Sequence, residues 1–170
     1  MQIVLITSSS NAVRETIESL PYVEVYTINC ANFNHGSFVE IKNAIFTELE
    51  KCFSEKGIPD LLLTYRCPCL IPKSLYSQAR IGAFNIHPSL LPKYPGLNPW
   101  EEIFHNKECE SGITIHFLSE KPDSGSIVLQ EKFQIETNDT IYMAREKSDH
   151  ISSKMVRNLI CLMSNSLMIE

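Results

Sequence analysis

The stretch FNIHPSLLPKYPG, residues 84–96, places an asparagine and a histidine two positions apart at the end of an apolar run. Asn85 offers a neutral N–H donor to a carbonyl oxygen that gains negative charge, and His87 donates a second hydrogen bond as an imidazolium. Asp123, in SEKPDSGSI, can hold that histidine charged and relay a proton through water. Each residue alone is more often a buried imidazole, a strand-end amide or a turn residue, but together they predict an acyl-transfer site.

The sequence has no obvious nucleophile next to these three residues. Ser89 follows His87 by two positions, and a Gly-x-Ser-x-Gly elbow is absent. An acyl-enzyme is therefore disfavoured, and direct attack by an amine on a bound acyl donor fits the residues better.

The apolar patterning predicts the elements that must position these residues. Short β-branched or apolar runs predict strands over residues 2–7, 23–28, 59–65, 82–87, 112–120 and 126–135. Helical spacing, capping residues and prolines predict helices after SSSN, over 38–56 with Gly57 as the stop, within 70–78, over 99–106 and from Thr140 onward.

This order predicts one α/β domain built on an open, mostly parallel, doubly wound (Rossmann-like) sheet. Sites in such sheets lie outside the carboxyl ends of the strands, where the predicted strand 82–87 delivers Asn85 and His87. The four prolines between residues 88 and 99 exclude regular structure. We expect this loop to form a wall of the cleft.

Composition narrows the class of partner. The 15 Lys and Arg against 20 Asp and Glu give a net charge of −5, which argues against nucleic acid and for small molecules. The N-terminus MQIVLITSSS predicts neither a signal peptide nor a membrane span. We expect a cytoplasmic protein with six reduced cysteines. RCPCL, residues 66–70, lacks the second Cys or His pair of a zinc site, so no metal is expected.

NIHPSLLPKYPG (85–96) and GITIHFLSEKPDSGSIVLQ (112–130) resemble two motifs of the 10-formyltetrahydrofolate-dependent formyltransferases. That family includes phosphoribosylglycinamide, methionyl-tRNA and sugar N-formyltransferases. The resemblance implies a formyltransferase catalytic domain over residues 1–170, with 10-formyltetrahydrofolate as co-substrate and a small primary amine as acceptor.

The resemblance also implies roles for individual residues. The catalytic residues would be Asn85, His87 and Asp123. The donor pocket would be lined by Cys69, Leu70, Ile71, Ser119, Glu120, Lys121, Pro122 and Asp123. The acceptor would be bound by Ser9, Ser10, Asn11, Pro88, Ser89, Lys147 and His150.

The acceptor is the least determined feature of the sequence. HPSLLPKYPG is nearest to the glycinamide ribonucleotide enzyme of purine biosynthesis, and TSSSN stands where that enzyme has a glycine-rich phosphate loop. Ser9, Ser10 and Asn11 could offer hydroxyls and helix N-terminal N–H groups to a phosphate, or they form a plain helix cap.

Other segments favour other acceptors. LIPKSLYSQARIGAFNIH and GLNPW are more similar to the methionyl-tRNA and sugar enzymes. We expect neither the second domain and basic surface that hold tRNA nor the extra C-terminal elements of the sugar enzymes. The alternatives are an amino-sugar-nucleotide or methionyl-tRNA-like formyltransferase, or a folate-binding relative without turnover. The oligomeric state is open.

Overall fold

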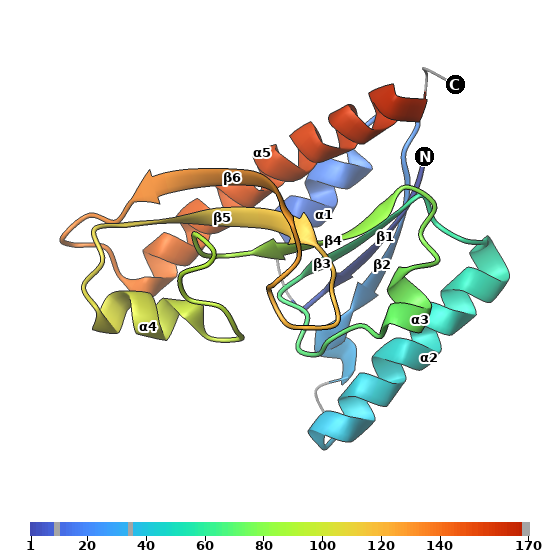
Figure 1. The fold of residues 1–170 in the computed structure, drawn as a ribbon, viewed down its shortest axis with the longest axis horizontal. Helices are drawn as coiled ribbons and strands as arrows, with labels where there is room; N and C mark the ends of the chain where they lie inside the picture. The colour runs from blue at the N-terminus through green and yellow to red at the C-terminus, as the bar shows by residue number, and fades with distance from the viewer. Residues whose placement is uncertain (9–10, 34–35, 168–170) are drawn as a thin grey trace.

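The computed structural model describes residues 1–8, 11–33 and 36–167 (Figure 1). Its strands and helices follow the order predicted from the sequence, with one addition, the short 3-10 helix η1. The elements are β1 (Gln2–Thr7), α1 (Asn11–Glu18), β2 (Glu24–Asn29), η1 (Cys30–Phe33), α2 (Phe38–Lys56), β3 (Leu61–Tyr65), α3 (Lys73–Tyr76), β4 (Gly82–His87), α4 (Pro99–His105), β5 (Glu110–Phe117), β6 (Ile127–Gln134) and α5 (Ile141–Leu167).

The strands form one sheet in the order β2-β1-β3-β4-β5-β6. The β2–β1, β1–β3 and β3–β4 pairs are parallel, whereas β5 and β6 are antiparallel to their neighbours. This arrangement confirms the open, mostly parallel α/β sheet. The chain passes from β1 to β2 on one side and then to β3 on the other, so the order reverses at β1 and β3. Ligands of open α/β sheets bind at such a switch point.

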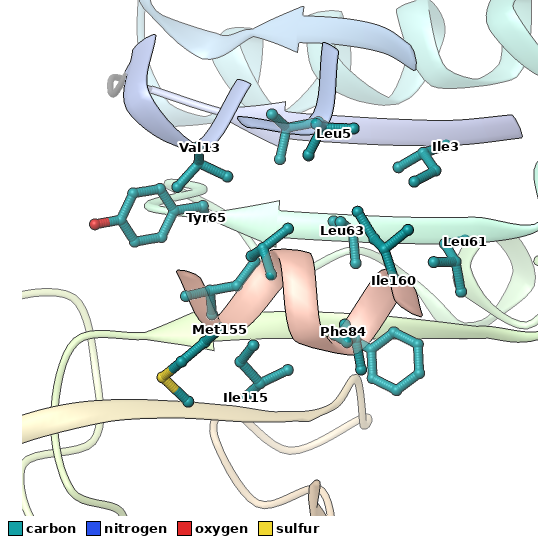
Figure 2. Packing of buried hydrophobic residues seen from close by; sticks show 14 of the residues in the cluster. Ile3, Leu5, Val13, Leu61, Leu63, Tyr65, Phe84, Ile115, Met155 and Ile160 are labelled. Atoms are coloured by element: carbon teal, nitrogen blue, oxygen red, sulfur yellow. The ribbon is translucent and has the colours of Figure 1, made fainter. Parts of the chain in front are cut away.

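Helices cover both faces of the sheet, as a doubly wound fold requires (Figure 1). On one face α1 and α5 pack over the strands, and Figure 2 shows Val13 and Met155 among the strand residues Leu5, Leu63 and Ile115. On the other face Ile45 and Leu49 of α2 pack against the opposite sides of β1 and β3. All five residues of β3 are buried, which explains why its sequence is apolar rather than alternating.

Helix α2 shows how local sequence sets an element's bounds. Ser37 and Glu40 form a capping box: the Ser37 side chain accepts from the Glu40 N–H at 3.4 Å, and the Glu40 carboxylate accepts from the Ser37 N–H at 2.6 Å. The helix ends at Lys56 and is followed by the capping residue Gly57, whose φ of +90° would strain any residue with a Cβ.

The proline-rich segment between β4 and α4 is held firmly against β5. The Thr114 hydroxyl donates to the Ser89 carbonyl at 2.7 Å and accepts from the Leu91 N–H at 3.1 Å. Beyond it, Trp100 and Ile103 of α4 form a small core with Ala144 of α5. In the described ranges, no helix has the length and apolar character needed to cross a membrane.

Candidate active site

A cavity of about 640 Å³ opens at the carboxyl ends of β1, β3 and β4. One part of its lining is polar and comes from the strand ends and α5. The other part is apolar and comes from the loops after β3 and β5 and from the starts of α2 and α4. The polar lining comprises Ser8, Thr64, Arg66, Asn85, His87, His116, Ser119, Asp123 and Arg145; the apolar lining includes Phe38, Pro68, Leu70, Ile71, Pro88, Leu97, Pro99, Trp100, Leu118 and Pro122.

Asn85 lies on β4 with both ends of its amide held. Its Oδ1 accepts a hydrogen bond from the Thr64 hydroxyl at 2.8 Å. Its Nδ2 lies 3.1 Å from His116 Nε2 and donates to Asp123 Oδ1 at 3.3 Å. These contacts fix the amide so that its Nδ2 faces the Asp123 carboxylate and His116 at the cavity wall, the kind of fixed N–H donor that can stabilise an oxyanion.

His87 ends β4 and is buried, and its ring orientation is fixed by the proline-rich loop. Nε2 donates to the Tyr94 carbonyl at 2.8 Å, so the neutral ring presents an unprotonated Nδ1 to Asp123 Oδ1, 3.6 Å away. Burial lowers the pKa of His87 and outweighs the opposing effect of Asp123. The structure thus corrects the expectation of a standing imidazolium: His87 is a neutral ring poised to take a proton at Nδ1.

Asp123 is carried over the site by the loop between β5 and β6. Its φ is +48°, and its Oδ2 accepts from the Gly96 N–H at 2.7 Å. Burial raises the pKa of Asp123, but hydrogen bonding from His116, the nearby His87 and the Gly96 N–H together hold it below its ordinary value. Asp123 is therefore an ionised carboxylate at neutral pH.

His116 is a site residue that the sequence reasoning missed. It is almost fully buried on β5, beside a register shift between Ile115 and His116, and its Nε2 lies 3.5 Å from Asp123 Oδ1. Bulges of this kind often re-aim a side chain at a functional site. The sequence signal that could have identified His116 was its position in the alternating strand ITIHF. That signal is weak, because only the pairing of β5 with β4 brings His116 opposite Asn85.

Some of the residues predicted for the donor pocket line the cavity, and others do not. Cys69, Leu70 and Ile71 line the cavity from the loop after β3, and Ser119 and Pro122 line it from the loop that carries Asp123. The predicted Glu120 and Lys121 are not among the lining residues, because they face solvent on the outside of that loop.

Two exposed apolar side chains were missing from the predicted donor site. Phe38 and Leu97 line the cavity beside the predicted Leu70, although the three are 58%, 72% and 51% exposed. Large apolar side chains left open around a concave site are typical of ligand-binding surfaces.

Two thiols in the cavity wall are poor nucleophiles. A hydrogen bond with Cys30 raises the pKa of Cys67 to about 12. A hydrogen bond with Cys67, followed by burial, raises the pKa of Cys69. Both thiols are protonated at neutral pH, which agrees with direct transfer rather than a thioester intermediate. The residues described contain no group of three or more His, Cys, Asp or Glu side chains arranged to hold a metal.

The predicted acceptor residues are dispersed. Pro88 lines the cavity, but Ser89 is fully buried and its hydroxyl donates to the Lys93 carbonyl at 2.7 Å. Lys147 pairs with Asp139 at 2.5 Å, and His150 lies in a separate groove between α1 and α5. The structure therefore places Ser89, Lys147 and His150 away from the cavity, in contrast to the expectation.

The predicted phosphate segment cannot be placed in the same way. Ser9 and Ser10 lie outside the described residues, as does the side chain of Asn11, which begins α1. Their role in binding stays a prediction.

The fold is that of the open α/β class, with the cavity at the switch point of the sheet. The model of the Formyl transferase family matches residues 3–159, and the chain belongs to that family.

Individual relatives agree with this membership. The chain is 39% identical over 98 residues to the methionyl-tRNA formyltransferase of Borrelia garinii subsp. bavariensis. This match covers 58% of this chain and 31% of the relative. The chain thus spans about a third of the length of the curated relatives it matches.

Solved structures show the same fold. Phosphoribosylglycinamide formyltransferase from Bacillus halodurans superposes with a TM-score of 0.72 at 23% identity, covering 94% of this chain and 95% of that one. A formyltetrahydrofolate deformylase from Pseudomonas syringae pv. tomato superposes with a TM-score of 0.75 at 17% identity, and the match covers 96% of this chain and 61% of that one.

Proposed function

We propose that this chain transfers a formyl group from 10-formyltetrahydrofolate to a small primary amine. The observation that carries the proposal is the convergence of Asn85, His87 and Asp123 at one end of a cavity whose remaining wall is largely apolar. Asp123 Oδ1 lies 3.3 Å from Asn85 Nδ2 and 3.6 Å from His87 Nδ1. The apolar wall suits the pterin and benzoyl rings of the donor.

The geometry supports a direct transfer. The acceptor amine attacks the formyl carbon, and the resulting oxyanion takes the Asn85 N–H that points to Asp123 in the ligand-free site. The proton lost by the amine passes to His87 Nδ1 or to the Asp123 carboxylate, two unprotonated groups that lie next to each other. The bond to the folate nitrogen then breaks, and that nitrogen receives the proton.

Glycinamide ribonucleotide is the first acceptor to test, with purine biosynthesis as the corresponding role. Solved phosphoribosylglycinamide formyltransferases have the same fold, and the motif around His87 is nearest to theirs. The curated relatives are named methionyl-tRNA formyltransferases, so methionyl-tRNA belongs in the same panel. An amino-sugar nucleotide completes it, because GLNPW is similar to the sugar enzymes as well as to the methionyl-tRNA enzymes.

Release of tetrahydrofolate, followed by absorbance, tests the activity. The assay uses 10-formyltetrahydrofolate with each amine, and a reaction without amine measures hydrolysis. Turnover that depends on one amine supports transfer. Release at the same rate without any amine contradicts it.

Donor binding is tested apart from turnover. The unreactive analogue 5-formyltetrahydrofolate should raise the melting temperature, because a ligand that binds only the folded state stabilises it. Binding without turnover would indicate a folate-binding relative, and a flat titration of folded protein would remove the donor site itself.

The catalytic assignment has its own variants. Asn85→Ala and Asp123→Asn should each lower kcat by roughly a hundredfold or more, the scale for losing an oxyanion donor or an acid–base group. Near-normal kcat in a folded variant of either contradicts the assignment.

A further inference from the structure

The cavity is more basic than the chain that contains it. The protein has a net charge of −5, yet the described residues that line the cavity include two arginines, Arg66 and Arg145, and a single carboxylate, Asp123. That carboxylate is already occupied, since it accepts from the Gly96 N–H and the Asn85 amide. The two guanidinium groups are therefore the charged groups in the described lining that could receive an anion.

Arg66 stands at the point where the strand order reverses. It directly follows β3, and its carbonyl accepts a hydrogen bond at 2.6 Å from the hydroxyl of Ser8, which directly follows β1. Its guanidinium donates to Asp149 of α5 at 2.8 Å. This ion pair turns the Arg66 side chain toward α5 at the edge where open α/β sheets bind ligands.

Arg145 approaches the same place from α5. It precedes Asp149 by four residues, and residues at that spacing share one face of a helix. Arg145 is thus a neighbour of the carboxylate that holds Arg66. Its own partner is Glu101 at 3.3 Å, in a pair whose side chains are 44% and 55% exposed. Exposed pairs contribute little, so the Arg145 guanidinium can turn toward a ligand.

The predicted donor residues and the arginines approach the cavity from different elements. Leu70, Ile71 and Pro122 come from the loops after β3 and β5, whereas Arg145 comes from α5 and Arg66 is drawn toward α5 by Asp149. A donor with its rings against those two loops leaves the α5 side to the acceptor.

We infer that Arg66 and Arg145 form a subsite for an anionic group, a carboxylate or a phosphate, on the acceptor amine. Guanidinium groups bind both kinds of oxyanion through paired N–H donors. The inference rests on the proposed function and specifies its substrate class: the preferred acceptor is an anionic amine.

Matched acceptor pairs test the subsite and separate the two oxyanions. One pair is glycinamide ribonucleotide and its dephosphorylated nucleoside, and the other is an amino acid and its carboxamide. The wild type should prefer the anionic member of at least one pair. Arg145→Gln should lower kcat/KM for that member tenfold or more, mainly through KM, and leave the neutral member unchanged, while Arg145→Lys retains part of the preference.

Two further variants sharpen the comparison. Arg66→Gln combined with Asp149→Asn removes the ion pair without leaving a lone carboxylate, and it should also weaken the anionic acceptor. Lys132→Gln removes a positive charge from the exposed pair with Glu110 on the antiparallel edge, outside the cavity lining. This control should leave the preference intact.

The donor's glutamyl tail is also anionic, and it provides the decisive counter-test. Calorimetry with 5-formyltetrahydrofolate and with its analogue lacking glutamate should give the same affinities in Arg145→Gln as in the wild type. A selective loss for the glutamate-bearing compound would assign the arginines to the donor and overturn the inference. Equal effects on both members of each acceptor pair would also overturn it.

Failure of the proposed function gives a different result. If 5-formyltetrahydrofolate binds but no amine is formylated, transfer itself is contradicted. The subsite is then judged by titration of inorganic phosphate and of acetate into the protein with 5-formyltetrahydrofolate bound. Binding that Arg145→Gln abolishes supports the subsite, and absence of binding for both anions in the wild type overturns it.

Discussion

Asn85 and His116 face each other across the antiparallel pair of β4 and β5, with Asn85 Nδ2 3.1 Å from His116 Nε2. His116 Nδ1 donates to the Phe117 carbonyl at 2.9 Å, and its Nε2 faces both the Asn85 amide and Asp123 Oδ1. On the other side, the Thr64 hydroxyl donates to Asn85 Oδ1. The orientation of the Asn85 amide is therefore set by neighbours from two strands.

Thr64→Val tests this orientation. The substitution keeps the shape of the side chain but leaves Asn85 Oδ1 without its 2.8 Å donor. We expect kcat to fall about tenfold, since losing one buried hydrogen bond is worth about 1 kcal/mol and the amide is then free to turn. Donor KM should change little. Thr64→Ser, which restores the hydroxyl, should recover most of the rate; equal kcat in the valine and wild-type proteins would contradict the role of Thr64.

The burial of His87 predicts a pH dependence of stability. Its pKa is lowered in the folded protein, whereas the unfolded chain has an ordinary value of about 6.5. Below that pH the unfolded state binds more protons, so the free energy of unfolding should fall as the pH drops from about 6.5 to the lower folded pKa, and His87 should not affect it above about 6.5.

Urea unfolding of the wild type and of His87→Gln from pH 5 to 8 measures this effect. The variant can still donate to the Tyr94 carbonyl but does not titrate, so the difference between the two proteins should shrink or reverse as the pH falls below about 6.5. Asp123 does not interfere in this pH range. Because its pKa is lowered in the folded protein, its contribution to the free energy of unfolding is lost only below about pH 3.9. A constant difference from pH 5 to 8 would contradict the buried neutral ring.

The protonated thiols of the cavity wall predict an order of chemical reactivity. Because hydrogen bonding with Cys30 raises the pKa of Cys67 to about 12, iodoacetamide at pH 8 should modify the exposed Cys109 and Cys161 first. Peptide mass spectrometry over time gives the order. Cys67→Ala and Cys69→Ala should keep kcat within a few-fold of the wild type, whereas loss of turnover in both would indicate a nucleophilic role for the thiols.

The sequence predicted the elements well because their signals are local. Helix α2 begins at Phe38 and ends at Lys56, as its apolar spacing and Gly57 indicated. The 3-10 helix Cys30–Phe33 has no such periodic signal and was missed.

The candidate site was predictable only where a motif carried it. Asn85, His87 and Asp123 lie in two recognisable motifs and converge in the structure. His116 and Arg145 reach the cavity through strand register and the packing of α5, which are long-range consequences of the fold. Ser89 was expected at an acceptor but does not line the cavity, because its hydroxyl donates to the Lys93 and Tyr94 carbonyls within the proline-rich loop.

Gly125 is required by the way the loop carrying Asp123 folds back on β5. A Cβ built at Gly125 would lie 1.8 Å from the Phe117 carbonyl oxygen, which is backbone and cannot yield without moving the strand or the loop. In Gly125→Ala the loop must therefore shift, and Asp123 shifts with it. Displacement of a catalytic group by about 1 Å is expected to cost about a hundredfold in rate.

The matched control is Gly57→Ala, at the end of α2. Its φ of +90° strains an alanine, but no atom lies within 4 Å of the added Cβ. The control should destabilise the protein by about 1–3 kcal/mol and leave kcat unchanged. Thermal unfolding and steady-state kinetics of both variants separate the two effects: loss of kcat/KM confined to Gly125→Ala supports the placement of Asp123 by this loop, and a parallel loss in both would attribute it to stability alone.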